Sequence, residues 1–153
     1  MSNSEHTKIG ADFQKAVQQY FIKKYGSGFE LEMQIKIGYS EDDQKEHKFD
    51  IVNPEQRIVI ECKRYTWTET GNVPSAKIRA INEAAFYLSF LPDAYEKYIV
   101  MLRSQHKKKQ ETLAEYYYRT NHHLLGKTRI AEYDPTYDPT VPDSFRIIGS
   151  KVE

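Results

Sequence analysis

The chain contains a single cysteine and carries no net charge. Cys62 is the only cysteine among 153 residues, and 22 lysines and arginines balance 22 aspartates and glutamates. One cysteine excludes an internal disulfide and any zinc site built from cysteines. The charge balance excludes a histone-like polycation and a protein with a long acidic tail. It does not exclude a nucleic-acid partner, because affinity for phosphates depends on local rather than total charge.

Long apolar runs are absent as well. No stretch approaches the roughly 20 consecutive apolar residues that span a bilayer. The segment from Met1 to Lys8 has no apolar stretch behind its charges, so no secretory signal is expected. The sequence therefore predicts a cytoplasmic protein with no membrane partner.

The length suits one ordinary domain, and no internal repeat or low-complexity segment divides the chain. We expect a single domain over residues 1–153, with a core at about 9–133 and a C-terminal extension at 134–153. Apolar side chains at helical spacing predict helices over residues 9–25, 75–91 and 107–120. Alternating patterns or short unbroken apolar runs predict strands over residues 31–37, 48–52, 57–65, 98–102, 127–133 and 145–148. This order predicts an α/β fold, in which helices cover the faces of a mixed sheet.

Three polar side chains fall on the second and third predicted strands, namely Asp50, Glu61 and Lys63. Residues two apart on a strand point to the same side, so Glu61 and Lys63 share a face and Cys62 takes the other. A short turn joins the two strands, and antiparallel pairing can bring the Asp50 carboxylate beside that of Glu61. The apolar residues 58–60 indicate a strand interior, where charges are costly to bury without a purpose.

Two carboxylates that converge near a lysine suit a hard divalent cation, Mg²⁺ or Mn²⁺. Such an ion, held by Asp50 and Glu61, can bind a phosphate oxygen and lower the pKa of a bound water. Lys63 can then orient or deprotonate that water. The alternative is a surface ion pair between Glu61 and Lys63, worth at most about 1 kcal/mol. The apolar run before Glu61 argues against that alternative.

Asp50 followed by Glu61-x-Lys63, on two adjoining strands after an N-terminal helix, resembles the PD-(D/E)XK nuclease superfamily. This group includes many restriction endonucleases, Holliday-junction resolvases and Mrr-like enzymes, and the resemblance covers roughly residues 9–102. It implies a restriction-endonuclease-like fold with an αβββαβ core and a Mg²⁺-dependent endonuclease that hydrolyses phosphodiester bonds of DNA. It also implies that Asp50, Glu61 and the Cys62 backbone carbonyl bind the metal and that Lys63 is catalytic. Many small members act as dimers, so the resemblance also allows a homodimer.

The chain departs from the family pattern in two places. Phe49 precedes Asp50, where the family name has proline. Many members carry Gly-x-x-Phe-Glu on the first helix, and the glutamate joins the metal shell; here Gln14 takes that place. An amide can ligate a metal or hold a metal-bound water, but it adds no charge, which leaves one or two metals open. Gln14 and the neutral charge favour the alternative function, a nucleic-acid-binding module or subunit of a larger complex that keeps the fold without the chemistry.

Six basic residues are candidates for contacts with nucleic-acid phosphates. They are Arg64, Lys77, Arg79, Lys107, Lys108 and Lys109. The alternative for each is an exposed, solvated helix face. Ser75 is expected to cap the second helix, with phosphate binding at the helix start as the alternative. Glu83 on that helix can face either the site or solvent, and solvent is favoured. His47 lies three residues before Asp50, an odd spacing that places it on the opposite face of the strand.

Overall fold

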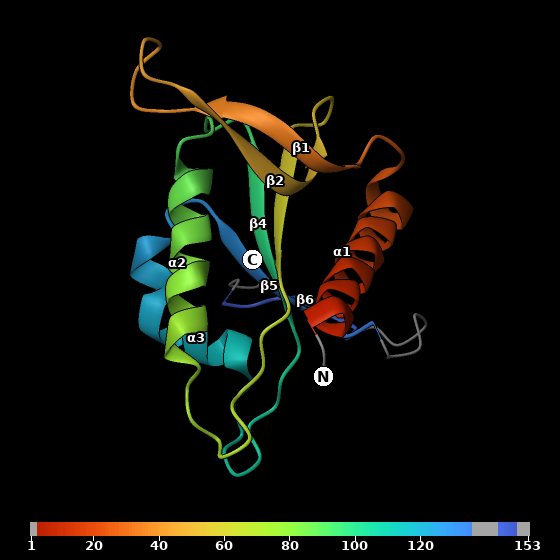
Figure 1. Cartoon of the computed structure of the whole chain (residues 1–153), viewed down its shortest axis with the longest axis vertical. Coiled ribbons are helices and arrows are strands. Elements are labelled where there is room, and N and C mark those ends of the chain that lie inside the picture. Colours follow the sequence, from red (N-terminus) through yellow and green to blue (C-terminus); the bar gives the residue numbers. More distant parts are fainter. Residues whose placement is uncertain (1–2, 136–143, 150–153) are drawn as a thin grey trace.

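A computed structural model of the chain describes residues 3–135 and 144–149, with side chains from Asp12 onward (Figure 1). In order along the chain, the described residues form helix α1 (Asn3–Tyr25), strands β1 (Glu30–Ile37), β2 (Lys45–Asn53) and β3 (Ile58–Lys63), helix α2 (Ser75–Ser89), strand β4 (Glu96–Leu102), helix α3 (Leu113–Asn121), a short 3₁₀ turn η1 (His122–Leu124), and strands β5 (Arg129–Tyr133) and β6 (Phe145–Ile147). The α/β prediction is confirmed.

The six strands form one mixed sheet in the order β1-β2-β3-β4-β5-β6. β1, β2 and β3 pair antiparallel as a meander, β3, β4 and β5 run parallel, and β6 returns antiparallel at the edge. The two parallel connections each contain a helix, as parallel crossovers generally do. The carboxyl ends of β3, β4 and β5 therefore meet at one edge of the sheet.

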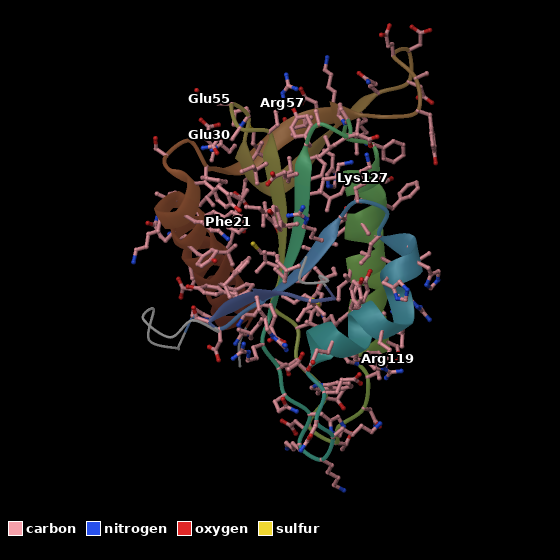
Figure 2. The ribbon with its side chains drawn as sticks, turned by 180° about the vertical axis from the view of Figure 1, so that it is seen from behind. Phe21, Glu30, Glu55, Arg57, Arg119 and Lys127 are labelled. Carbon is pink, nitrogen blue, oxygen red and sulfur yellow. The ribbon has the colours of Figure 1, made fainter. Side chains whose placement is uncertain are left out.

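Helices cover both faces of the sheet. α1 lies on one side, and α2 and α3 lie together on the other (Figure 1). Phe13, Val17 and Phe21 recur every four residues of α1 and are buried against the sheet; Phe21 lies between helix and strands (Figure 2). The opposite core is formed by α2, α3 and the facing strand residues. No helix in the described part of the chain is long and apolar enough to cross a membrane.

The third predicted helix begins later than the sequence pattern indicated. The prediction placed it over 107–120, whereas α3 begins at Leu113. Thr112 and Glu115 form a capping box, in which the Glu115 N–H donates to Thr112 Oγ1 and the Thr112 N–H donates to Glu115 Oε1. The basic residues before Thr112 belong to a loop, so they do not open a helix.

The start of α2 and the C-terminal extension differ from what the sequence pattern predicted or are only partly described. Ser75 is not a cap, because α2 begins at Ser75 itself and Pro74 precedes it without a side-chain capping bond. The predicted C-terminal extension is described only at residues 134–135 and 144–149, and the rest of it lies outside the described residues. The predicted edge strand at 145–148 corresponds to β6.

Candidate active site

Asp50 and Glu61 lie opposite one another on β2 and β3. The antiparallel register pairs Ile51 with Ile60, so the next pair along the strands is Asp50 and Glu61. The backbone ladder ends at Ile51, and the Asp50 side chain takes the place of the next ladder bond: its Oδ2 accepts a hydrogen bond from the Cys62 N–H at 2.8 Å. The structure thus brings together the two carboxylates that the sequence placed on adjoining strands.

Cys62 offers its backbone, and not its thiol, to this site. The N–H and C=O of one residue in an extended strand point to the same side, and the Cys62 N–H points toward Asp50. The Cys62 carbonyl therefore faces the opening where β2 separates from β3. The side chain packs on the α1 side of the sheet. Burial, followed by the charges of Asp50 and Glu61, raises the pKa of the Cys62 thiol, which disfavours the nucleophilic thiolate.

Glu61 is only 6% exposed. Burial, the nearby charge of Asp50 and a hydrogen bond to Asp50 raise the pKa of Glu61 to about 9, although Lys63 lowers it. With this pKa, Glu61 holds its proton at neutral pH and is hydrogen-bonded to Asp50, as expected when two carboxyl groups lie close together. Among the described residues, Lys63 makes no ion pair with Glu61. The surface ion pair considered above is therefore not present.

Neutralising Glu61 is expected to stabilise the metal-free protein at alkaline pH. A folded-state pKa raised from 4.5 to about 9 means that the folded chain holds this proton more tightly than the unfolded chain does. The folded state therefore loses stability as the pH rises from about 4.5 to about 9. Glu61→Gln keeps a donor for Asp50 and removes the titration. At pH 8 in EDTA we expect it to raise the free energy of unfolding by about 2–3 kcal/mol, with no gain at pH 4.

Urea unfolding at the two pH values measures this difference. Glu83→Gln is the matched control, because Glu83 borders the same recess but is exposed. A gain for Glu61→Gln that is equal at both pH values would contradict the prediction.

Two recesses meet at Asp50 and Lys63. A groove of about 680 Å³ runs between α1 and the loop after β3, and a smaller recess of about 270 Å³ lies beside α2. Asp50 and Lys63 line both of them. Gln14 lines the larger groove, and its Nε2 donates to the Asp50 backbone carbonyl at 3.0 Å. Gln14 thus ties α1 to β2 at Asp50.

A change of face in β1 and β2 explains how Asp50 borders both recesses. Phe49 packs on the α2 side of the sheet and Ile51 on the α1 side, although residues two apart normally share a face. Opposite Asp50 on β1, Glu32 has a φ of 55°, in the left-handed region that side-chain-bearing residues rarely adopt. Both strands turn over at this pair, which leaves Asp50 between the two faces.

His47 lies where the sequence did not place it, and Glu83 is exposed as expected but also borders the site. His47 was expected away from Asp50, but it lines the smaller recess together with Asp50, Glu61 and Lys63, because the alternation of β2 breaks at Asp50. Its ring stacks on Tyr87 at 3.9 Å between centroids, and burial lowers the pKa of His47. Glu83 is exposed, as expected, yet it lines the same recess.

A helical pattern could have identified this side of the site from the sequence. Ala80, Glu83, Ala84 and Tyr87 recur at steps of three, one and three, which places them on one helix face. All four line the smaller recess. The two small alanines let the helix approach the strands closely and leave room for the recess.

The basic candidates separate into three groups. Arg64 and Lys77 line the larger groove. Arg79 is exposed on α2 and lines neither recess. The remaining three, Lys107, Lys108 and Lys109, are exposed on the loop between β4 and α3.

Sequence reasoning missed Tyr65, which lines the larger groove between two lysines. The ammonium of Lys63 lies 6.0 Å and that of Lys77 5.2 Å from the centre of its ring. Cation–π attraction at these distances holds both lysine side chains along the groove wall.

The donor set near Asp50 is made of oxygen atoms. It comprises two carboxylates and one backbone carbonyl, which suit Mg²⁺ or Mn²⁺ better than zinc. The described residues include no group of three or more His, Cys, Asp or Glu side chains that could hold a metal. A divalent cation here would therefore rely on the Cys62 carbonyl and on water to complete its coordination.

Comparison of the chain with protein-family models, with curated proteins and with solved structures yields no match.

Proposed function

We propose that this protein is a Mg²⁺-dependent endonuclease that hydrolyses phosphodiester bonds of DNA, with a restriction-endonuclease-like fold of the PD-(D/E)XK type. The observation that carries the proposal is the direct pairing of Asp50 with Glu61 at the point where the β2–β3 ladder ends, with Lys63 on the same recess. The order of α1, the β1–β2–β3 meander, α2 and β4 supports it, because this is the αβββαβ order of the family.

The paired carboxylates fit a divalent cation. A divalent cation could replace the proton that Glu61 holds beside Asp50. Its positive charge would also relieve the repulsion between the two carboxylates. Asp50, Glu61 and the Cys62 carbonyl would hold the ion. When bound, it would polarise a phosphate oxygen and lower the pKa of a coordinated water.

The chain's own residues supply the remaining functions. Lys63 lines both recesses and can hold the attacking water or offset negative charge that develops on the phosphate. Gln14 holds the Asp50 backbone in place through its amide nitrogen. Arg64 and Lys77 place positive charge along the larger groove, where a nucleic-acid backbone would lie.

Incubation with supercoiled plasmid DNA and Mg²⁺ tests this proposal. A circular substrate has no ends, so an endonuclease nicks or linearises it whereas an exonuclease leaves it intact. We expect nicked and linear products with Mg²⁺ and none with EDTA. Calorimetric titration with Mn²⁺ in the absence of DNA should detect binding.

One observation favours a second function, a DNA-binding module without catalysis. Gln14 stands where many family members supply a further carboxylate, and the described residues include no group of three or more His, Cys, Asp or Glu side chains that could hold a metal. This alternative predicts that the protein binds duplex DNA but leaves the plasmid intact, and that titration with Mn²⁺ releases or absorbs no heat of binding. The same two measurements therefore separate the functions.

A further inference from the structure

Two loops at the carboxyl ends of β3 and β4 pack together as one unit. Residues 64–74 follow β3 and residues 103–112 follow β4, and the two loops extend side by side past the start of α2 (Figure 1). The Trp67 N–H donates to Ser104 Oγ at 3.2 Å, and Trp67 Nε1 donates to the Ser104 carbonyl at 2.9 Å. Lys107 Nζ donates a hydrogen bond to the Glu69 backbone carbonyl at 3.2 Å. We call these two loops the loop pair.

His106 joins the loop pair from within. It is 8% exposed, and its Nδ1 accepts hydrogen bonds from the backbone N–H groups of Lys108 and Lys109, each at 3.0 Å. Because Nδ1 accepts, Nε2 carries the hydrogen and donates to the Gly71 carbonyl at 2.9 Å. The His106 ring also packs edge-on against the Trp67 ring, with 4.8 Å between the ring centroids. Both nitrogens are thus used, one on each loop.

Gly71 is shaped for this contact. Its φ is +81°, and a Cβ added there would lie 3.0 Å from His106 Nε2. Glycine meets both requirements, since it tolerates the left-handed conformation and leaves space for the ring. The fit of His106 against the first loop therefore depends on this position.

The second loop is braced internally, which turns its lysines outward. Gln105 forms a β-bridge with Thr112, and Gln105 Nε2 donates to the Lys109 carbonyl at 2.8 Å. The His106 N–H donates to the Glu111 carbonyl at 3.1 Å. These bonds occupy the interior of the loop, and the side chains of residues 107–109 are exposed.

The three lysines of this loop form no direct ion pair with a neighbouring acid in the described structure, although a hydrogen bond from Arg119, together with the charge of Lys109, lowers the pKa of Glu111. The acid of the same loop, Glu111, is instead held by Arg119 of α3, whose Nε and Nη2 donate to its carboxylate at 2.9 and 3.1 Å. A chain with no net charge therefore places three exposed lysines next to one another on a loop that is hydrogen-bonded internally.

We propose that the loop pair is a preorganised wing that binds the phosphate backbone of duplex DNA through Lys107, Lys108 and Lys109, with His106 as the positioning residue. Its place supports this role, because residues 64–69 of the first loop line the larger groove beside Asp50 and Lys63. Lysines on a braced backbone lose less freedom on binding than lysines on a free loop. The inference deepens the proposed nuclease function and rests on it for the position of DNA in the groove.

Duplex binding measured by fluorescence anisotropy in EDTA tests the wing without any cleavage. Replacing Lys107, Lys108 and Lys109 together by alanine should lower affinity by about tenfold or more and reduce the slope of log K against log salt by about 2–3, since each phosphate contact contributes about 0.9. The matched control replaces three exposed lysines that belong to neither loop, Lys23 of α1, Lys36 of β1 and Lys45 of β2.

Both triple variants remove the same charge. A larger loss for the loop variant supports the wing, and equal losses overturn it, because they would reflect total charge alone.

Variants of His106 test its positioning role. His106→Ala should weaken binding and lower the salt slope, because the backbone of Lys108 and Lys109 loses its acceptor. His106→Asn retains an acceptor near the position of Nδ1 and should recover part of both quantities. A folded His106→Ala protein, checked by thermal unfolding, whose affinity and salt slope equal those of the wild type would overturn the role of His106.

A pair of glycine variants tests the fit between the loops. Gly71→Ala should act like His106→Ala. Gly26→Ala is its control, because Gly26 also has a positive φ, +99°, but a Cβ there meets nothing within 4 Å. A loss of affinity in Gly71→Ala alone supports the contact with His106, and equal effects of the two variants overturn it.

The wing and the nuclease can fail separately. If the loop lysines govern duplex binding but wild-type protein leaves plasmid intact, the nuclease proposal fails and the wing stands. If plasmid is cleaved and the loop triple variant binds and cleaves like wild type, the wing fails and the nuclease stands.

Discussion

Lys63→Met is expected to abolish plasmid cleavage, with a loss of at least about 10³-fold in rate, while Mn²⁺ binding is preserved. The methionine keeps the apolar stem of the side chain and removes only the ammonium. Lys63 lines both recesses at the carboxylates, and it forms no ion pair among the described residues that its loss would leave unbalanced. The fold should therefore survive, as thermal unfolding would show.

The matched control is Lys77→Met. Lys77 lies over the same Tyr65 ring as Lys63 and lines the same groove, but it does not line the smaller recess that holds Glu61. It should weaken DNA binding and leave the maximal rate close to that of the wild type. A Lys63→Met protein that cleaves as well as Lys77→Met would contradict the assignment of Lys63.

Asp50→Asn tests whether the Asp50 carboxylate binds the metal. The amide oxygen of asparagine can still accept the hydrogen bond from the Cys62 N–H, so the end of the β2–β3 ladder is retained. The variant should lose both cleavage and Mn²⁺ binding, because a neutral amide is a poor ligand for a hard dication. Undiminished Mn²⁺ binding by Asp50→Asn would place the metal elsewhere.

Glu132→Gln should destabilise the fold by about 3 kcal/mol. Glu132 is fully buried on β5, and its Oε2 accepts hydrogen bonds from Arg103 at 2.9 Å and from Arg146 of β6 at 2.7 Å. Neutralising the carboxylate removes the buried negative charge that both guanidinium groups contact at Glu132. Loss of a partner from a buried ion pair is among the most destabilising single changes. Urea unfolding at pH 7 measures the effect.

The destabilisation caused by Glu132→Gln should be larger at neutral pH than in acid. Burial raises the pKa of Glu132, but hydrogen bonds from Arg146, Thr112 and Arg103 outweigh it, and the net direction is downward from 4.5. The carboxylate therefore contributes its stability above about pH 4.5, and that contribution is lost as pH falls through the lower folded-state pKa. The difference between wild type and variant should be constant from pH 6 to 8 and shrink below about pH 4.5.

Glu115→Gln is the control for Glu132→Gln. Glu115 also contacts Arg146, at 3.5 Å, but its side chain is 38% exposed. Glutamine preserves the capping box at the start of α3. The change should therefore cost less than about 1 kcal/mol. Equal destabilisation by the two variants would show that burial of the Glu132 carboxylate is not what makes it important.

Much of the fold and the pairing of Asp50 with Glu61 could be predicted because they depend on local patterns. Strands have a period of two, so Glu61 and Lys63 had to share a face. The turn between β2 and β3 is short, so their pairing had to be antiparallel and close in register. Residues 58–60 are unbroken and apolar, which indicated a buried strand. Each of these rules acts over a few residues of chain.

The rest of the site depends on contacts that no short segment contains. His47 reaches the smaller recess only because β2 changes face at Asp50, opposite the left-handed Glu32 of β1. The start of α3 was misplaced because residues 105–112 satisfy their backbone groups within a loop instead of a helix. His106 meets Gly71 across 35 residues of chain.

The sequence by itself determined the order of helices and strands, the faces of Glu61 and Lys63, and the chemical types available for a metal and a phosphate. Periodicity and residue chemistry are properties of the chain, and they hold before it folds. Only the tertiary structure decided that Asp50 opens onto both recesses, that α2 brings Glu83 to the smaller one, and that two distant loops pack into one unit. These features arise from backbone irregularities and long-range packing, which are selected by the whole fold and not by any local stretch.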